Sequence, residues 1–375
     1  MKTLLAIIIT ATFSFGCAIL EGEQTTTDSG GGGTTAAPTT PAPAVASPVP
    51  LKGVKKISVG RLASCALLHD GRVKCWGSNG WGKVGDGTDI DRYYATTVEG
   101  ITDAIDVNAS SYSHACAILS DRRIKCWGYG NNGEMGNGTR QRLNSTPQYV
   151  NNINNAVELA HHADGTVALL SDGTLKKWGD VAPTATNKLE PSNITGVANI
   201  ASLGGTYIAV SNTQTIIDWY DGNHPLHGLT SVEKISRSCA LFTDQTVKCH
   251  SSLGPYSISS GVPTQINGLS SVSDIATGMG SLCALISDGT VKCLGRNFGG
   301  QLGDGTTTDR SAPTIIPDLD NVTAISMHEY NGCALLADNT TKCWGYNHIG
   351  QLGSGTTSGS GDPAVPFPTT VMTLE

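Results

Sequence analysis

Ten of the eleven cysteines in this 375-residue chain occur in five pairs of identical spacing, which is the arrangement expected of disulfides. In every pair the second cysteine follows the first by ten positions: Cys65 and Cys75, Cys116 and Cys126, Cys239 and Cys249, Cys283 and Cys293, and Cys333 and Cys343. Zinc binding would require four converging ligands, which pairs on separate segments do not supply. We therefore expect five disulfides, and with them an oxidising compartment.

The phrase that surrounds each pair recurs seven times, beginning at Cys65, Cys116, Val167, Ile208, Cys239, Cys283 and Cys333. Two copies lack cysteine, and each lacks it at both positions. Val167 is matched by Lys177, and Ile208 by Asp218. Joint presence or joint absence is expected if the two sulfurs of a copy are bonded to each other.

Each phrase has the pattern of a β-hairpin, with alternating apolar residues on both sides of a turn. In CALLHDGRVKCWG, residues 65–77, a three-residue loop at 69–71 would place glycine in the left-handed position. That loop sets Cys65 directly opposite Cys75. Opposed residues at a non-hydrogen-bonded site have Cα atoms about 4.5 Å apart, which a disulfide can bridge.

The eleventh cysteine, Cys17, follows the apolar run LLAIII and the softer segment TATFSFG. Residues 1–16 therefore indicate a signal peptide, since they are too short to span a bilayer comfortably. Gly16-Cys17 resembles the cleavage box of bacterial lipoproteins, in which the cysteine receives diacylglycerol. Ordinary signal peptidase would also accept this region, and Cys17 would then be removed. We expect an exported protein of the cell envelope, either an outer-membrane lipoprotein or extracellular.

Residues 17–50 are expected to form a flexible tether, because they are rich in Thr, Gly, Pro and Ala and offer almost nothing apolar to bury. About thirty such residues have a mean end-to-end distance of roughly 30 Å, enough to hold a folded domain away from a membrane. Residues 51–375 then form the folded part.

The seven copies indicate an all-β ring. The fuller copies continue past the hairpin with a glycine-rich loop such as WGSNGWGKVGDGT, residues 76–88, followed by a short apolar strand. Four short strands in each of seven units close most economically into a propeller, because an open stack leaves two raw sheet edges. The segment PTTVM near the C-terminus is expected to complete a blade begun by the first strand.

The run G-x-N-x-x-G-Q-L-G-x-G-T, preceded by D-G-x-V-x-x-W-G and followed by D-R-x-x-P, resembles the regulator of chromosome condensation repeat family. Members of that family form seven-bladed β-propellers, and the resemblance covers residues 54–375. The founding member is a nuclear exchange factor for a small GTPase that also binds nucleosomes. This chain differs from it, because its net charge is −7, its N-terminus indicates export, and its copies three to five are shortened.

No enzyme is expected. The nine histidines have no repeated partner, and G-x-S-x-G and H-E-x-x-H are absent, so we expect no catalytic residue, cofactor or metal. The repeated GDGT segments lack G-K-[ST] and indicate turns. No block of Lys and Arg exceeds two consecutive residues, which argues against nucleic acid as a partner.

A binding function remains, and its candidate residues are exposed aromatic and arginine side chains of the loops. They are Trp81, Arg92, Tyr93, Tyr94, Tyr129, Arg140 and Arg142. Arg92 occupies the repeat position of Arg310 and so could instead brace its blade. The tryptophan of each Trp-Gly is expected in the core.

We therefore expect a monomeric, non-catalytic propeller, anchored to the membrane through lipid on Cys17, that binds a protein or a glycan at the cell surface. The first alternative is a secreted inhibitor of a hydrolase, since a secreted β-lactamase inhibitory protein has a similar seven-bladed architecture. The second is an activity like that of the GTPase exchange factor.

Overall fold

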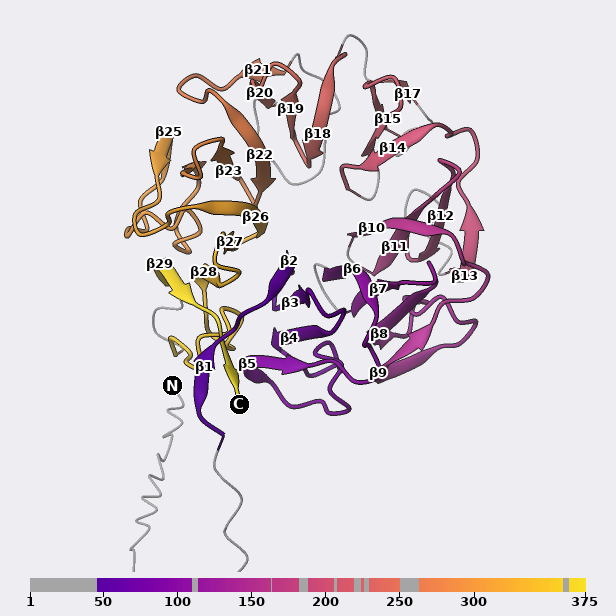
Figure 1. Ribbon diagram of the computed structural model, residues 1–375. Coiled ribbons are helices and arrows are strands. Elements are labelled where there is room, and N and C mark those ends of the chain that lie inside the picture. Colours follow the sequence, from indigo (N-terminus) through magenta and orange to yellow (C-terminus); the bar gives the residue numbers. More distant parts are fainter. Residues whose placement is uncertain are drawn as a thin grey trace, which may run out of the picture. The chain divides into compact units, whose positions relative to one another are not determined.

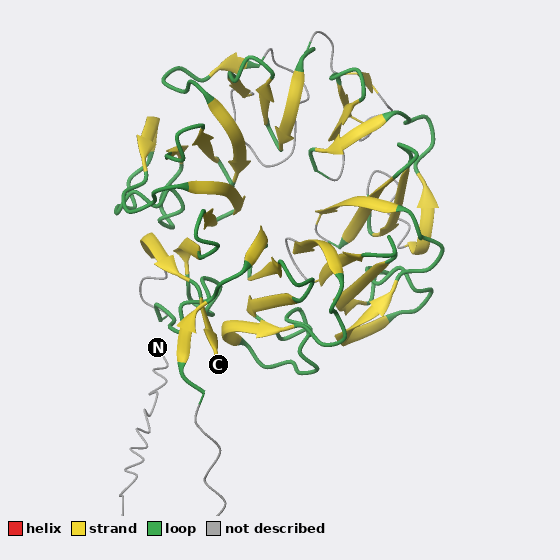
Figure 2. Ribbon diagram, viewed as in Figure 1, coloured by secondary structure: helices red, strands yellow, loops and turns green. Residues whose placement is uncertain are grey.

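The computed structural model describes residues 46–109, 114–162, 164–181, 188–205, 208–218, 224–225, 229–249, 263–359 and 364–375. The predicted signal peptide at 1–16, Cys17 and the predicted tether up to residue 45 lie outside these ranges, whereas residues 48–50, at the end of the predicted tether, form a strand. Ala46–Glu375 forms one compact unit. Figure 2 shows strands and loops but no helix in the described part, so no described helix is long and apolar enough to cross a membrane.

Seven blades of four consecutive antiparallel strands make up this unit in the described residues. Blades 1 to 4 contain β2 (Val54–Val59), β3 (Ala63–Leu68), β4 (Val73–Gly77) and β5 (Arg92–Thr97); β6 (Ala104–Ala109), β7 (His114–Leu119), β8 (Ile124–Gly130) and β9 (Gln141–Tyr149); β10 (Ala156–His162), β11 (Gly165–Leu170), β12 (Leu175–Gly179) and β13 (Lys188–Asn193); and β14 (Ile200–Leu203), β15 (Ile208–Ser211), β16 (Ile216–Asp218) and β17 (His224–Pro225). Blades 5 to 7 contain β18 (Val232–Ser236), β19 (Cys239–Phe242), β20 (Val247–Cys249) and β21 (Thr264–Gln265); β22 (Val272–Thr277), β23 (Ser281–Ile286), β24 (Val291–Gly295) and β25 (Arg310–Ile315); and β26 (Val322–His328), β27 (Asn331–Leu336), β28 (Thr341–Tyr346) and β29 (Ala364–Thr370).

The blades form a ring, and the first strand of each blade lies on the inside (Figure 1). The core lies between blades rather than within one. One cluster, for example, joins Val73 and Leu67 of blade 1 to Val107 and Trp127 of blade 2. A single repeat therefore cannot bury its own faces, and neighbouring copies are needed for stability. The seven-bladed β-propeller predicted from the sequence is confirmed.

The predicted hairpin register and the five bridges are also confirmed. Cys65 lies opposite Cys75, Leu68 accepts a bond from the Gly71 amide, and Gly71 has φ of +83°. All five bridges have the same geometry, with Cα atoms 4.0 to 4.1 Å apart. In the two copies without cysteine, Val167 faces Lys177 and Ile208 faces Asp218, as the spacing predicts.

The ring closes differently from the prediction that the C-terminal segment PTTVM completes a blade begun by the first strand. Blade 7 is complete without the N-terminal strand, because β29 already pairs with β28. The last strand, β30 (Met372–Leu374), instead joins the outer edge of blade 1, where it runs parallel to β5 and antiparallel to β1 (Pro48–Pro50). Blade 1 thus carries six strands. The two prolines of β1 remove amide donors from the outermost edge, which protects it from further pairing.

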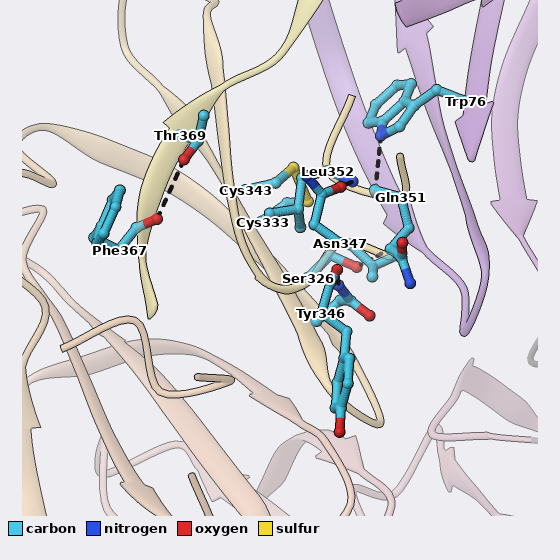
Figure 3. Close-up of a disulfide and its surroundings, with 12 residues drawn as sticks. Trp76, Ser326, Cys333, Cys343, Tyr346, Asn347, Gln351, Leu352, Phe367 and Thr369 are labelled. Atoms are coloured by element: carbon cyan, nitrogen blue, oxygen red, sulfur yellow. Dashed lines mark hydrogen bonds between the residues drawn. A yellow bond between two sulfur atoms is a disulfide. The ribbon is translucent and has the colours of Figure 1, made fainter. Parts of the chain in front are cut away.

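The Trp-Gly tryptophans connect neighbouring blades. The indole of Trp76 in blade 1 donates to the carbonyl of Gln351 in the glycine-rich loop of blade 7 at 3.0 Å (Figure 3). The same bond joins Trp127 to Lys83, Trp178 to Glu134 and Trp344 to Gln301, at 2.8 to 2.9 Å. These four indoles are fully buried. We call this contact the tryptophan latch.

Each latched loop also makes a backbone hydrogen bond to the next blade. Gly87 donates to Ser145, Gly138 to Leu189, Gly305 to Pro366 and Gly355 to Tyr93, at 2.8 to 3.0 Å. A Cβ at Gly85 would come within 2.9 Å of the latching Trp127, which explains the glycine at this position. The GDGT segments are therefore turns, as predicted, and they also join neighbouring blades.

Candidate functional site

Two sets of connections meet at one end of the blades, and we call this end the loop face. It is formed by the turns between first and second strands and by the loops between third and fourth strands. Backbone bonds join the two sets: Ser78 donates to Leu62, Arg296 to Gly280 and Tyr346 to Tyr330. Because the glycine-rich loops of blades 1, 2, 6 and 7 share one repeat pattern, corresponding positions in these four loops occupy equivalent places.

Three of the predicted binding residues come together on the loop face. The rings of Trp81 and Tyr129 pack edge to face with centroids 5.3 Å apart, and the Arg142 guanidinium lies 4.3 Å from the centroid of the Trp81 ring. Trp81 belongs to blade 1, whereas Tyr129 and Arg142 belong to β8 and β9 of blade 2. We call this group, which spans a blade boundary, the Trp81 cluster.

The Trp81 cluster sits on a fixed base. The backbone of Gly82 presses on β9, since a Cβ there would lie 2.6 Å from the Ser145 Cα. Asn79 lies beneath the loop and is fully buried. Its amide nitrogen donates to Asp86, Thr88 and Ile90, and its oxygen accepts from Val84. Asn297 repeats this pattern in blade 6.

Arg92 is positioned away from the Trp81 cluster. Its guanidinium pairs with Asp86 and donates to the Thr88 hydroxyl, and Arg310 makes the same two contacts with Asp304 and Thr306. The guanidinium therefore braces its own loop, as the shared repeat position suggests.

Tyr93 and Tyr94 lie against the glycine-rich loop of blade 7. A Cβ on Gly350 or Gly355 would meet the ring of Tyr93 or Tyr94 at 2.3 Å. Both tyrosines line a hollow of about 610 Å³ at the outer edge of blade 1, together with Lys74 and Thr373 among others. Arg140 is exposed, and no contact of its side chain with the Trp81 cluster is observed among the described residues.

A second aromatic group on the loop face was not predicted. Phe298, Tyr330 and Tyr346 pack edge to face with centroids 5.2 to 6.3 Å apart, and His348 contacts Tyr346. We call these four residues the Phe298 cluster. Aligning the loops would have indicated part of it, since Tyr346 shares the repeat position of Tyr129. Tyr330 comes from a turn that varies between copies, so it carries no such signal.

Three side chains on the inside of the ring have the composition of a metal site. Ligand atoms of His114, Cys116 and His161 lie within 4.8 Å of one another. The Cys116 sulfur is bonded to Cys126, however, and is not available as a thiolate. His161 donates from Nε2 to the Asn108 carbonyl and accepts at Nδ1 from the Thr166 hydroxyl, which in turn accepts from His114. Burial lowers the pKa of His161 to about 3 and that of His114 well below its usual value, so both imidazoles are neutral. The donor set does not fit a metal.

Two strongly shifted pKa values, apart from those of His114 and His161, belong to the eighth residue of the glycine-rich loop. This position is counted from the Trp-Gly tryptophan. Glu134 accepts a bond from the Asn132 amide, and burial raises its pKa to about 7. Lys83 occupies the same position in blade 1, and burial lowers its pKa to about 8. Both groups lie under the loop rather than on its surface, so they do not form an exposed acid and base.

Comparisons with known proteins agree with this architecture. The regulator of chromosome condensation (RCC1) repeat matches residues 54–82 and 105–134. The human protein named probable E3 ubiquitin-protein ligase HERC6 is 28% identical over 181 residues, which are 45% of this chain and 18% of that protein. The ultraviolet-B receptor UVR8 of Arabidopsis thaliana is 28% identical over 162 residues, which are 43% of this chain and 36% of the receptor.

This chain spans less than half of the length of these curated relatives. Among solved structures, Prp20p of Saccharomyces cerevisiae has a TM-score of 0.50 and 18% identity, with 84% of this chain and 76% of that chain covered. That likeness concerns the fold. The chain is therefore a seven-bladed β-propeller, two segments of which match the regulator of chromosome condensation repeat.

Proposed function

We propose that this chain is a non-catalytic propeller that recognises a protein partner through the loop face, and that lipid on Cys17 and the tether between Cys17 and β1 hold it at the cell envelope. One observation carries the proposal: Trp81, Tyr129 and Arg142 are assembled from two blades into one group. Trp, Tyr and Arg are the residue types that dominate the binding energy of protein interfaces.

The geometry of the Trp81 cluster favours a protein over a glycan. A sugar packs its C–H groups against an open, flat ring face. The Arg142 guanidinium already covers one face of Trp81, and Tyr129 meets the same ring edge to face. What remains accessible is a mixed surface of ring edges and guanidinium donors, which suits apolar side chains and carbonyl or carboxylate oxygens.

The relatives support the class of function but supply no partner. Prp20p is described as binding Gsp1p and histones, which are proteins. Because Prp20p is only 18% identical to this chain, we do not assign its partners to this chain. The matched part of HERC6 is 18% of that protein, so we propose no ligase activity for this chain.

Quantitative recovery of partners from the envelope fraction of producing cells tests the binding proposal. The Trp81→Ala and Arg142→Ala variants of the full chain should each recover at least tenfold less partner, equivalent to about 1.4 kcal/mol. Tyr149→Ala is the matched control, because Tyr149 is an exposed ring under Arg123 and Lys125 outside the cluster. Equal recovery by all three variants would refute a role for the Trp81 cluster.

Attachment to the envelope is tested separately by intact mass and fractionation. The membrane-extracted chain should begin at Cys17 and carry a diacylglyceryl adduct, and Cys17→Ser should be recovered in the soluble fraction. An unmodified, soluble wild-type chain would contradict the anchor but leave the binding proposal intact.

A further inference from the structure

The Phe298 cluster is an exposed aromatic surface that its own loop does not require. Phe298 is 51% exposed, and His348 is exposed as well. The fifth loop position holds Phe298 in blade 6, but Gly80 in blade 1 and Asn131 in blade 2. The loop keeps the same buried asparagine network with glycine in blade 1 as with phenylalanine in blade 6. An aromatic ring at this position is therefore not needed for folding.

The cluster is bordered by cationic groups. The stem of Arg296 lies over Gly280, where a Cβ would meet Arg296 Cδ at 2.9 Å, and its guanidinium is exposed. No carboxylate of the described residues lies within ion-pair distance of Arg296. Arg61 pairs with Glu329 at 3.0 Å, beside Tyr330. An exposed arginine with no acidic partner among the described residues offers its positive charge to an acidic ligand.

We propose that the Phe298 cluster and Arg296 form a second docking site, which binds a short acidic segment of a protein that also carries a bulky apolar side chain. The apolar side chain would pack on the rings of Phe298 and Tyr346, and a carboxylate would pair with Arg296. The three rings meet edge to face rather than as one flat stack, and the charge of the neighbouring Arg296 favours a ligand that carries a carboxylate. The ligand class rests on the proposed protein-binding function, but the residues are independent of the Trp81 cluster.

The test uses the full folded chain, with its disulfides intact, and a displayed library of random 12-residue peptides. Enriched peptides are synthesised with a fluorophore, and their dissociation constants are measured on wild type, Phe298→Asn, Arg296→Ser and Trp81→Ala. The first two substitutions copy Asn131 and Ser78, which this chain already places at those loop positions, so both variants should fold. Thermal unfolding checks this.

Enriched peptides should combine Asp or Glu with Leu, Ile, Met or Phe. Their affinity should fall at least tenfold for Phe298→Asn and about fivefold for Arg296→Ser, change less than twofold for Trp81→Ala, and weaken with added salt. No enrichment, enrichment of basic peptides, or equal binding to Phe298→Asn would overturn the proposal. Peptides that lose binding only to Trp81→Ala would overturn this site while supporting the first one.

Discussion

At the scale of single residues, the eighth position of the glycine-rich loop shows how one side chain can make stability depend on pH. Glu134, Gln301 and Gln351 each accept a bond from the amide two residues earlier, at 2.8 to 2.9 Å. All three side chains are buried. Glutamine accepts this hydrogen bond without carrying a charge, whereas burying the ionised Glu134 carboxylate costs desolvation free energy.

Glu134→Gln should remove a pH dependence of folding. The pKa of Glu134 is about 7 in the folded chain and near 4.5 when unfolded, so its protonated form favours folding. The contribution of Glu134 to stability should therefore be greatest below pH 4.5, fall as the pH rises to about 7, and stay lower above that, by at most about 3 kcal/mol.

Denaturant unfolding from pH 4 to 8 measures this effect. The matched variant Gln301→Glu places a carboxyl in the same loop position of blade 6 and should add a loss of the same sign. If Glu134→Gln parallels the wild type at every pH, the buried carboxyl is not the cause.

The residues of the Trp81 cluster were predictable one by one, because exposed aromatic and arginine side chains stand out in a loop. Their assembly was not predictable, since it depends on how blade 1 meets blade 2. Arg92 shows the converse, because its repeat in Arg310 already indicated a bracing role. The Phe298 cluster was missed because it combines two loops with a turn that has no fixed pattern.

At the scale of elements, each disulfide fixes the second and third strands of a blade. Replacing Cys65 and Cys75 together with alanine should leave the fold intact, since Val167 and Lys177 occupy the same opposed positions in blade 3. The closed loop is short, so we expect a loss of about 2–3 kcal/mol in the free energy of unfolding. Denaturant titration measures it, with thiol titration as a check that the other eight paired cysteines stay bonded. An unchanged free energy would show that the bridge contributes no stability.

The tryptophan latch makes a separate prediction. Trp76→Phe keeps most of the buried ring but leaves the Gln351 carbonyl without its indole donor, at a cost of about 1–3 kcal/mol. Trp81→Phe, at a half-buried ring outside the latch, should cost no more than about 0.5 kcal/mol. Thermal and denaturant unfolding compare them, and equal losses would contradict the latch.

Strand pairing was predictable from the sequence because hairpins are local and the paired cysteines fix the register. The latches were not, because each joins residues about 44 positions apart, or 275 across the closure. The pattern is nevertheless visible in retrospect. Every blade that follows a full glycine-rich loop carries Trp at the latch position. After the shortened loops this position holds Trp219, His250 and Leu294, of which Trp219 and His250 lie outside the described residues.

At the scale of the whole molecule, the ring has a latched and an unlatched part. Latches join blades 1 to 2, 2 to 3, 6 to 7 and 7 to 1 among the described residues. Blades 3 to 5 lack the full loop in the sequence; among the described residues blade 4 makes no latch to either neighbour, and it lacks the cysteine pair. The β30 addition further secures blade 1, through a bond from the Thr373 hydroxyl to the Ala95 carbonyl.

Hydrogen exchange should reveal this difference. Amides of β15 and β16 in blade 4 should exchange earlier than those of β3 and β4 in blade 1, because opening blade 4 breaks fewer cross-blade contacts. Exchange followed by mass spectrometry at native pH measures it, with β7 and β8 of blade 2 as a second protected reference. Uniform protection around the ring would contradict the distinction.

Ring closure was only partly predictable, because the repeat pattern counts seven blades but does not say which edge the last strand joins. The short β30 has no repeat counterpart, and its pairing with β1 and β5 depends on how far β29 extends. Where a partner binds likewise depends on the assembled loop face, so the repeat pattern alone does not predict it.

Site-specific photocrosslinking in producing cells tests that loop face most directly. A photoreactive phenylalanine analogue at position 81 of the full chain, and the same analogue at position 149 as the control, are irradiated and the adducts identified by mass spectrometry. We predict one protein adduct from position 81 that is absent from position 149. No protein adduct from 81, or the same adducts from both positions, would contradict recognition through the Trp81 cluster.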